Sequence, residues 1–262
     1  MEGMKQPDKP AERGAKMDLP IIGEGKTTKV YRDGDRAVKL YTGAPPEEAH
    51  NEARRQTFAY EAGLPVPKVF GVRELAEGTA LDMECISGEP LLTPRMDKDA
   101  RHAAIERMVE LQCRVHSIDA TGQPGQADAI AWKIDHCARL SEPQKYALQE
   151  RLSRLSGGQS QLCHGDFHPL NILNDGSKLW IIDWVDSRCG SPLADVCRSH
   201  LIFLQHLPRI ANIYLRLYCE RARADREDVL AWLPVLAGAR LWEKQTEKEA
   251  AILLDILRDY AI

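Results

Sequence analysis

The hydrophobic pattern of this chain changes its period once, and this change restricts the possible folds more than any other feature. Between residues 19 and 85, short apolar runs alternate with turn residues, which is the pattern of strands joined by tight turns. The Asp33-Gly34 pair separates two such runs and predicts a hairpin. After Pro94 apolar residues recur at helical spacing, and from Pro192 onward the pattern is helical throughout. We therefore expect an α+β protein in which most strands precede most helices.

Each of these two parts contains one segment of the other kind. Residues 48–62 have helical spacing and end at Gly63, a typical residue after a helix. Residues 161–182 contain three short apolar runs, 161–163, 172–173 and 179–182, that predict strands within the helical part. The turn-rich segment 87–90 is a natural lobe boundary. The expected organisation is a disordered tail at 1–17, a small β-rich N-lobe with one main helix at 18–88, and a larger α-rich C-lobe at 89–262.

Charge and composition argue against several classes of protein. Lys plus Arg number 35 and Asp plus Glu number 39, and the resulting net charge of −4 is unlike that of a general nucleic-acid binder. No apolar run reaches the roughly 18 residues that span a bilayer, and residues 1–17 lack the apolar core of a signal peptide. The seven cysteines are scattered and form no C-x-x-C pair, which indicates reduced thiols. We expect a cytoplasmic protein without a nucleic-acid or membrane partner.

The densest chemical signal is the segment 162–184, in which polar residues lie between short predicted strands. His164-Gly-Asp166 is followed by Asn171 and then by Asp183 at a strand end. A carboxylate in such a loop can accept a proton from an attacking hydroxyl. A carboxamide oxygen and a second carboxylate suit Mg²⁺, which prefers oxygen ligands. Because phosphoryl transfer depends mainly on positioning and charge neutralisation, these residue types favour that reaction.

This segment resembles the motifs of the aminoglycoside phosphotransferase and choline kinase superfamily, a branch of the protein-kinase-like fold. The His164-Gly-Asp166-x-x-x-x-Asn171 spacing is similar to H-R-D-x-x-x-x-N of the protein kinases, and the Ile-Asp-Trp triplet around Asp183 to D-F-G. Five further stretches resemble family segments: 23–25, 37–39, 51–53, 80–86 and 190–196. The resemblance implies a bilobal protein-kinase-like fold.

The resemblance also implies roles for residues of the C-lobe. Asp166 would orient, and could deprotonate, the acceptor hydroxyl, and Asn171 and Asp183 would bind Mg²⁺. Structural support of the site would come from His164 and Asp195.

In the N-lobe, the resemblance implies a site for ATP or GTP. Lys39 would contact the nucleotide phosphates and would be held by Glu52, with Glu47 and Glu48 as rival partners. The remaining implied residues are Gly23 and Gly25 in the phosphate loop, which Lys26, Thr27 and Thr28 complete, and Glu84 and Ile86 at the hinge that frames adenine.

We therefore expect an Mg²⁺-nucleotide-dependent phosphotransferase that moves the γ-phosphoryl group of ATP or GTP to a small-molecule hydroxyl acceptor. The family acts on aminoglycosides, other antibiotics, choline and related compounds, so the resemblance implies an aminoglycoside-like antibiotic, with antibiotic resistance as its consequence, or a related small metabolite. Acidic and basic residues are nearly balanced over 92–262, which neither requires nor excludes a cationic acceptor. Residues 119–140, with Trp132, are the hypothetical acceptor wall.

Two other functions remain as alternatives. One is a pseudokinase or nucleotide-binding regulatory module, which would bind nucleotide without transferring phosphate. The other is a metal-dependent hydrolase that uses His164, Asp166 and His168, although Gly165 and Pro169 disfavour the helix that the four-residue histidine spacing would need.

Overall fold

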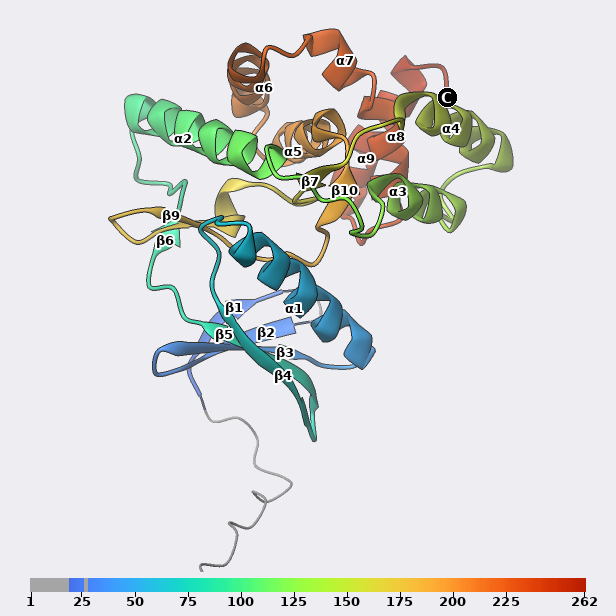
Figure 1. Ribbon diagram of the computed structural model, residues 1–262. Coiled ribbons are helices and arrows are strands. Elements are labelled where there is room, and N and C mark those ends of the chain that lie inside the picture. The colour runs from blue at the N-terminus through green and yellow to red at the C-terminus, as the bar shows by residue number, and fades with distance from the viewer. Residues whose placement is uncertain (1–18, 26–27) are drawn as a thin grey trace, which may run out of the picture. The chain divides into compact units, whose positions relative to one another are not determined.

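The computed structural model describes residues 19–25 and 28–262, so the expected tail at 1–17 and the loop residues Lys26 and Thr27 lie outside the described residues. The chain divides into two compact units. Unit 1 comprises the described residues up to Thr57 together with Pro67–Ile86, and unit 2 comprises Phe58–Val66 and Ser87–Ile262. Strands dominate unit 1 and helices dominate unit 2 (Figure 1). The expected α+β class is confirmed.

Unit 1 is built on a five-stranded antiparallel sheet with strand order β1-β2-β3-β5-β4. Its strands are β1 (Ile21–Glu24), β2 (Thr28–Asp33), β3 (Arg36–Tyr41), β4 (Val69–Leu75) and β5 (Gly78–Glu84). The predicted hairpin joins β2 to β3, and Gly34 takes the positive φ of 63° that so tight a turn requires. Helix α1 (Pro46–Glu61), predicted over 48–62, follows β3 and packs on the sheet (Figure 1).

Strand β3 is buried on both faces, which explains how it can deliver a lysine to the interior. Ala37 and Tyr41 pack with Ala49 of α1, whereas Val38 belongs to the cluster on the opposite face. Because side chains alternate along a strand, Lys39 shares the helix-facing side with Ala37 and Tyr41.

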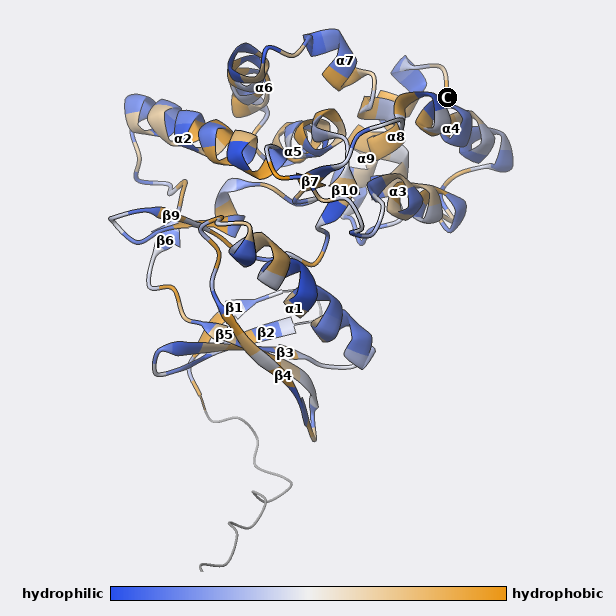
Figure 2. Cartoon of the chain, viewed as in Figure 1, coloured by the Kyte–Doolittle hydropathy of each residue, from blue (hydrophilic) through white to orange (hydrophobic). Residues whose placement is uncertain are grey.

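Unit 2 is formed mainly by helices packed around a central one. They are α2 (Lys98–His116), α3 (Gln126–Asp135), α4 (Glu142–Leu155), α5 (Pro192–His206), α6 (Pro208–Ala222), α7 (Arg226–Leu230), α8 (Leu233–Arg240) and α9 (Glu247–Asp259). Helix α5 contacts α6, α7, α8 and strand β7, and every residue from 194 to 203 is buried. Polar and apolar faces are visible on α2 and α4, whereas α8 is apolar along most of its length (Figure 2). Helix α5 is thus a core element, and α3, α4 and α9 are connected to it through α8.

Five short strands of unit 2 bring the polar segment together. They are β6 (Glu89–Pro90), β7 (Gln161–Cys163), β8 (Ile172–Asn174), β9 (Leu179–Ile181) and β10 (Arg188–Gly190). Strand β7 pairs with β10, and β8 pairs with both β6 and β9. The three strands predicted within 161–182 are therefore confirmed as β7, β8 and β9. Helix α3 was not expected in the stretch 119–140, where Gly122, Pro124 and Gly125 obscure its start.

The helices and the cysteines can be compared with what the composition predicts about membrane spans and disulfides. Among the described residues, no helix combines the length and apolar character that crossing a bilayer requires. All seven cysteines lie in the described part and are free thiols. Burial raises the pKa of the Cys163 thiol well above its ordinary value, which keeps it protonated and unreactive.

An ion cluster around Glu243 connects α3, α5 and α8. The Glu243 carboxylate lies 3.0 Å from Nζ of Lys133, 2.8 Å from Nη1 of Arg198 and 2.9 Å from Nη1 of Arg240. Burial by itself would raise the pKa of the Glu243 carboxyl, but the charges of Arg198, Lys133 and Arg240 outweigh it and lower the pKa to about 2. One carboxylate therefore forms ion pairs with cations from three helices.

We expect Glu243→Gln to destabilise unit 2 by about 3–5 kcal/mol at pH 7, because it leaves buried cations without a counter-ion. The Glu243 carboxyl has a pKa lower in the folded chain than in the unfolded one, where it is about 4.3. Its contribution is therefore complete above pH 5 and is lost as the pH falls towards 2. The difference in the free energy of unfolding between wild type and variant should therefore decrease as the pH falls over this range.

Urea unfolding followed by tryptophan fluorescence measures this effect in the correct unit, because all five tryptophans lie in unit 2. Glu220→Gln is the matched control, since Glu220 is exposed and pairs with Arg216 at the surface of α6. Equal effects of the two substitutions at pH 7 would contradict a structural role for the Glu243 cluster.

Candidate active site

The loop of residues 164–171 joins β7 to β8 and is held by helix α5 at Gly165. The Gly165 N–H donates to Oδ1 of Asp195 (2.6 Å), and the Gly165 carbonyl accepts from Nε of Arg198 (3.0 Å). Asp195 and Arg198 are three residues apart and so lie on one face of the helix. Both backbone polar groups of Gly165 are therefore bound to side chains of a largely buried helix.

Only glycine fits at position 165. Its φ is +82°, and a Cβ there would lie 2.4 Å from the carbonyl oxygen of Asp186. The residue before Asp166 thus combines a left-handed backbone with a close approach of a second chain segment.

Asp195 is itself fixed by side chains of α2. Its Oδ2 accepts hydrogen bonds from Nε2 of Gln112 (3.2 Å) and Nε2 of His116 (3.0 Å), and the His116 ring reaches the Tyr218 hydroxyl at 2.7 Å. Burial would raise the pKa of the Asp195 carboxyl, but His116 and the Gly165 N–H outweigh it and lower the pKa below its ordinary value. Asp195 is an ionised, fully bonded brace between α2, α5 and the loop.

His164 uses both of its ring nitrogens within the protein. Nε2 donates to the carbonyl of Ile182 (3.1 Å), and Nδ1 accepts from the N–H of Asp166 (3.3 Å). Burial lowers the pKa of the His164 imidazole, in agreement with this neutral tautomer. No lone pair is left for a zinc ion, which argues against the hydrolase alternative. Among the described residues, no three His, Cys, Asp or Glu side chains converge on a metal site.

Asp166 is a restrained carboxylate with one side open to solvent. Its Oδ2 accepts from Nε2 of His168 (3.2 Å) and from Nδ2 of Asn171 (3.3 Å), and Oδ1 lies 3.6 Å from Nη2 of Arg198. Burial would raise the pKa of the Asp166 carboxyl, but the His168 hydrogen bond and the charge of Arg198 hold the pKa well below its usual range. The side chain remains 28% exposed, so an ionised oxygen stays accessible.

Asn171 and Asp183 are brought to the same end of the β8–β9 hairpin. Ile172 pairs with Ile181 in the register, and the Ile182 N–H donates to the Asn171 carbonyl (3.0 Å). Asp183 follows directly with a left-handed φ of 65°, a conformation that is uncommon for residues other than glycine. The hairpin therefore brings the two predicted metal ligands into neighbouring backbone positions.

The donor set at this end of the hairpin fits Mg²⁺. The Asn171 amide donates through Nδ2 to the Asp166 carbonyl (3.0 Å), so its Oδ1 is directed elsewhere. This oxygen and the Asp183 carboxylate are hard ligands, and Mg²⁺ at a nucleotide commonly takes only one or two protein carboxylates or other oxygens.

In unit 1, the structure pairs Lys39 with Glu52 and not with Glu47 or Glu48. Nζ of Lys39 lies 2.9 Å from Oε1 and 2.8 Å from Oε2 of Glu52. The two side chains are 8% and 1% exposed, whereas Glu47 and Glu48 are exposed on the first turn of α1. The lysine is therefore held in one position by a buried carboxylate.

The other predicted residues of unit 1 lie in strands β1 and β5 or directly after them. Gly23 pairs with Val30 in β1, and the Gly25 N–H donates to the Thr28 carbonyl (2.8 Å). Glu84 ends β5, and its N–H donates to the Lys68 carbonyl (2.8 Å). In the described part of the chain, the Ile86 N–H has no hydrogen-bond partner, which leaves it available to a ligand.

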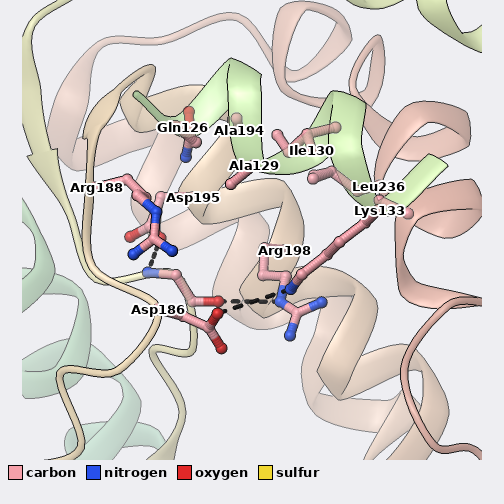
Figure 3. A pocket seen from close by; sticks show the side chains of 12 residues that line it. Gln126, Ala129, Ile130, Lys133, Asp186, Arg188, Ala194, Asp195, Arg198 and Leu236 are labelled. Carbon is pink, nitrogen blue, oxygen red and sulfur yellow. Dashed lines mark hydrogen bonds and ion pairs between the residues drawn. The ribbon is translucent and has the colours of Figure 1, made fainter. Parts of the chain in front are cut away.

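A pocket of about 50 Å³ adjoins the 164–171 loop within unit 2 (Figure 3). Its lining comes from α3, α5 and α8, from Gly165 and from the segment that leads into β10. Four lining residues belong to the stretch predicted as an acceptor wall, namely Gln126, Ala129, Ile130 and Lys133, whereas Trp132 is not among them. Arg198 lines the pocket and also reaches Asp166.

Sequence reasoning missed several residues of this site. Arg198 could have been found, because it follows the predicted brace Asp195 by one helical turn. His168 was noted, but its contact with Asp166 was not expected. Nothing in the sequence links Glu243 or Lys133 to the loop, because the Arg198–Glu243 and Lys133–Glu243 contacts join residues 45 and 110 positions apart.

The sequence model of the phosphotransferase enzyme family matches residues 19–233. Among solved structures, an aminoglycoside-3'-phosphotransferase of type VIII is 22% identical, with 85% of this chain and 93% of that chain covered and a TM-score of 0.62. A mutant of the aminoglycoside phosphotransferase APH(4)-Ia, in a complex with AMP-PNP and hygromycin B, is 18% identical, with 95% and 96% covered and a TM-score of 0.67. A choline/ethanolamine kinase family protein from Mesorhizobium loti is 19% identical, with 92% and 87% covered and a TM-score of 0.65.

Acyl-CoA dehydrogenase family member 10 from Mus musculus is 28% identical in an alignment of 223 residues that covers 71% of this chain. The match spans only 20% of the length of that relative. The solved neighbours confirm the expected protein-kinase-like fold. Because the family model covers most of the chain, from the strands of unit 1 through the loop of Asp166 to the start of α8, this chain belongs to the phosphotransferase enzyme family.

Proposed function

We propose that this chain transfers the γ-phosphoryl group of ATP or GTP to a hydroxyl group of a small molecule in an Mg²⁺-dependent reaction. The observation that carries the proposal is the grouping of Asp166, Asn171 and Asp183 by one loop and one hairpin. A relative solved with AMP-PNP and hygromycin B provides separate support. The remaining alternative, a regulatory module, predicts nucleotide binding without transfer.

Asp166 would accept the hydrogen bond of the acceptor hydroxyl and so aim its oxygen at the γ-phosphorus. The new O–P bond forms while the bond from the γ-phosphorus to the bridging oxygen breaks and the nucleoside diphosphate leaves. The hydroxyl proton passes to the Asp166 carboxylate. A carboxyl with a lowered pKa is a weak base, so this transfer is late, after the hydroxyl has become acidic in a loose transition state. Asp166 contributes mainly by orientation and charge.

Asn171 Oδ1 and the Asp183 carboxylate would hold Mg²⁺. When bound, the ion would neutralise charge on the nucleotide phosphates. The contact of the Asn171 amide with the Asp166 carbonyl keeps the Asn171 side chain in place without the ion.

Nucleotide binding is assigned to residues 18–88 in this proposal, and the catalytic and acceptor groups to 89–262. Lys39, held by Glu52, would contact phosphate oxygens, and the glycines at 23 and 25 would let the backbone approach the phosphates. The hinge from Glu84 to Ile86 would frame adenine, with the free Ile86 N–H as donor.

The acceptor in the proposal is an aminoglycoside-like antibiotic or a related small metabolite, and resistance would follow only from the first. The solved aminoglycoside phosphotransferases support the former class, and the choline/ethanolamine kinase family protein supports the latter. The proposed location is the cytoplasm, where seven free thiols would stay reduced.

Asp166→Asn should lower kcat by at least about 10²-fold and leave nucleotide affinity nearly unchanged, because the amide cannot take the proton. The measurement is Mg²⁺-dependent ADP or GDP release with a panel of aminoglycosides, amino alcohols and sugars, together with calorimetry of nucleotide binding. Asp255→Asn on the exposed face of α9 is the control. Transfer at a near-normal rate in Asp166→Asn would rule out the proposed role.

Asp183→Ala should raise the Mg²⁺ concentration needed for half-maximal nucleotide binding by at least about tenfold, because a direct ligand is lost. Calorimetric titration of the nucleotide at several Mg²⁺ concentrations measures this without relying on turnover. Unaltered Mg²⁺ dependence in this variant would show that the ion is held elsewhere. Asp255→Ala again serves as the matched control.

A further inference from the structure

The pocket beside the 164–171 loop contains a guanidinium without a carboxylate partner. Arg188 begins β10 and is half-buried, and its Nη1 donates to the carbonyls of Val185 (3.4 Å) and Ser187 (2.8 Å). Within residues 19–25 and 28–262, no carboxylate oxygen lies within 4.0 Å of this guanidinium. Its Nε and Nη2 make no hydrogen bond in the same part of the chain. These two groups form the fork that binds carboxylate or phosphate bidentately.

The neighbouring cations differ from Arg188 in this respect. Lys133, Arg198 and Arg240 all contact Glu243, and Lys133 also lies 3.7 Å from Asp186. The protein therefore compensates their charges internally. Burial lowers the pKa of the Arg188 guanidinium, whereas the more distant charge of Asp186 raises it. A desolvated cation that lacks an ion pair is stabilised when an anion binds.

Asp166 does not itself line the pocket that contains Arg188, but two residues next to it do. Gly165, the preceding residue, is part of the lining, and Arg198 lines the pocket while it contacts Asp166. Figure 3 shows Arg188 and Arg198 among the side chains that line this pocket. A volume of about 50 Å³ holds a group of a few heavy atoms and not a whole antibiotic.

We propose that the acceptor of this chain carries an anionic group, a carboxylate or a phosphate, which Arg188 binds in this pocket. The rest of the acceptor then extends along the 164–171 loop with its hydroxyl at Asp166. The anion site depends only on the geometry around Arg188, whereas its role as part of the acceptor site rests on the proposed function. Of the two proposed acceptor classes, this inference favours a small acidic metabolite over a polycationic aminoglycoside.

The test uses four three-carbon compounds that share a vicinal diol and differ only at the third carbon: glycerol, glycerate, glycerol 3-phosphate and 3-aminopropane-1,2-diol. Binding to the full chain is measured by calorimetry without nucleotide. Glycerate or glycerol 3-phosphate should bind, and the neutral and cationic diols should not. The preference between the two anions tells carboxylate from phosphate. Equal binding of all four, or binding of the amine alone, would overturn the anion site.

Arg188→Gln should weaken binding of the preferred anion by about 10- to 100-fold, the effect of losing a charge-assisted hydrogen-bond pair. Arg188→Lys retains the charge but loses the fork, and an intermediate loss is expected. Arg216→Gln, which removes an exposed arginine of α6, is the matched control. Melting curves establish that each variant is folded, and an unchanged affinity in folded Arg188→Gln would refute the proposal.

A kinetic arm separates this inference from the proposed function. With ATP and Mg²⁺, the preferred anion should stimulate ADP release, and Arg188→Gln should raise its KM without changing the KM for ATP. Anion binding without any transfer would keep the anion site and contradict the proposed function. Transfer to the cationic diol with no anion binding would keep the function and overturn the inference.

Discussion

The two hydrogen bonds that hold Gly165 to helix α5 are the constraint on which the rest of the site depends. Asp195 binds its N–H and Arg198 binds its carbonyl, and both side chains come from a largely buried helix of unit 2. The next residue, Asp166, cannot shift without breaking one of them. The bracing continues into α2, because Gln112 and His116 satisfy the second oxygen of Asp195. The 164–171 loop is thus attached to a helix that lies in the core of unit 2, which restricts its movement.

Arg198 has a second consequence, because it joins the loop to the ion cluster around Glu243. Its guanidinium binds Glu243 and also lies near Asp166, so the charge that lowers the pKa of Asp166 is itself positioned by a carboxylate on the turn after α8. The proton affinity of the proposed catalytic residue is therefore set partly by residues far from it in sequence. This arrangement favours orientation of an acceptor over strong base catalysis.

In unit 1, a buried carboxylate likewise fixes the position of a lysine. Period-two alternation in β3 turns Lys39 to the helix-facing side, and Glu52 of α1 meets it there as a buried carboxylate. A paired but desolvated lysine is held in one position, as the proposed contact with phosphate oxygens would require. At the pocket of unit 2, Arg188 has no such carboxylate partner among the residues that the structure describes. The contrast between a compensated and an uncompensated cation is the physical basis for inferring an anionic ligand.

The sequence by itself determined the α+β order of elements and most helix and strand positions, because hydrophobic period and turn residues act locally. It also identified Asp166, Asn171 and Asp183, whose spacing within one short segment resembles a known motif. Only the tertiary structure chose Glu52 over Glu47 and Glu48, revealed α3 and linked His168, Arg198 and Glu243 to Asp166. Those choices depend on which side chains are buried together, and burial joins residues that no local pattern connects, such as Glu243 with Arg198, 45 positions away, and with Lys133, 110 positions away.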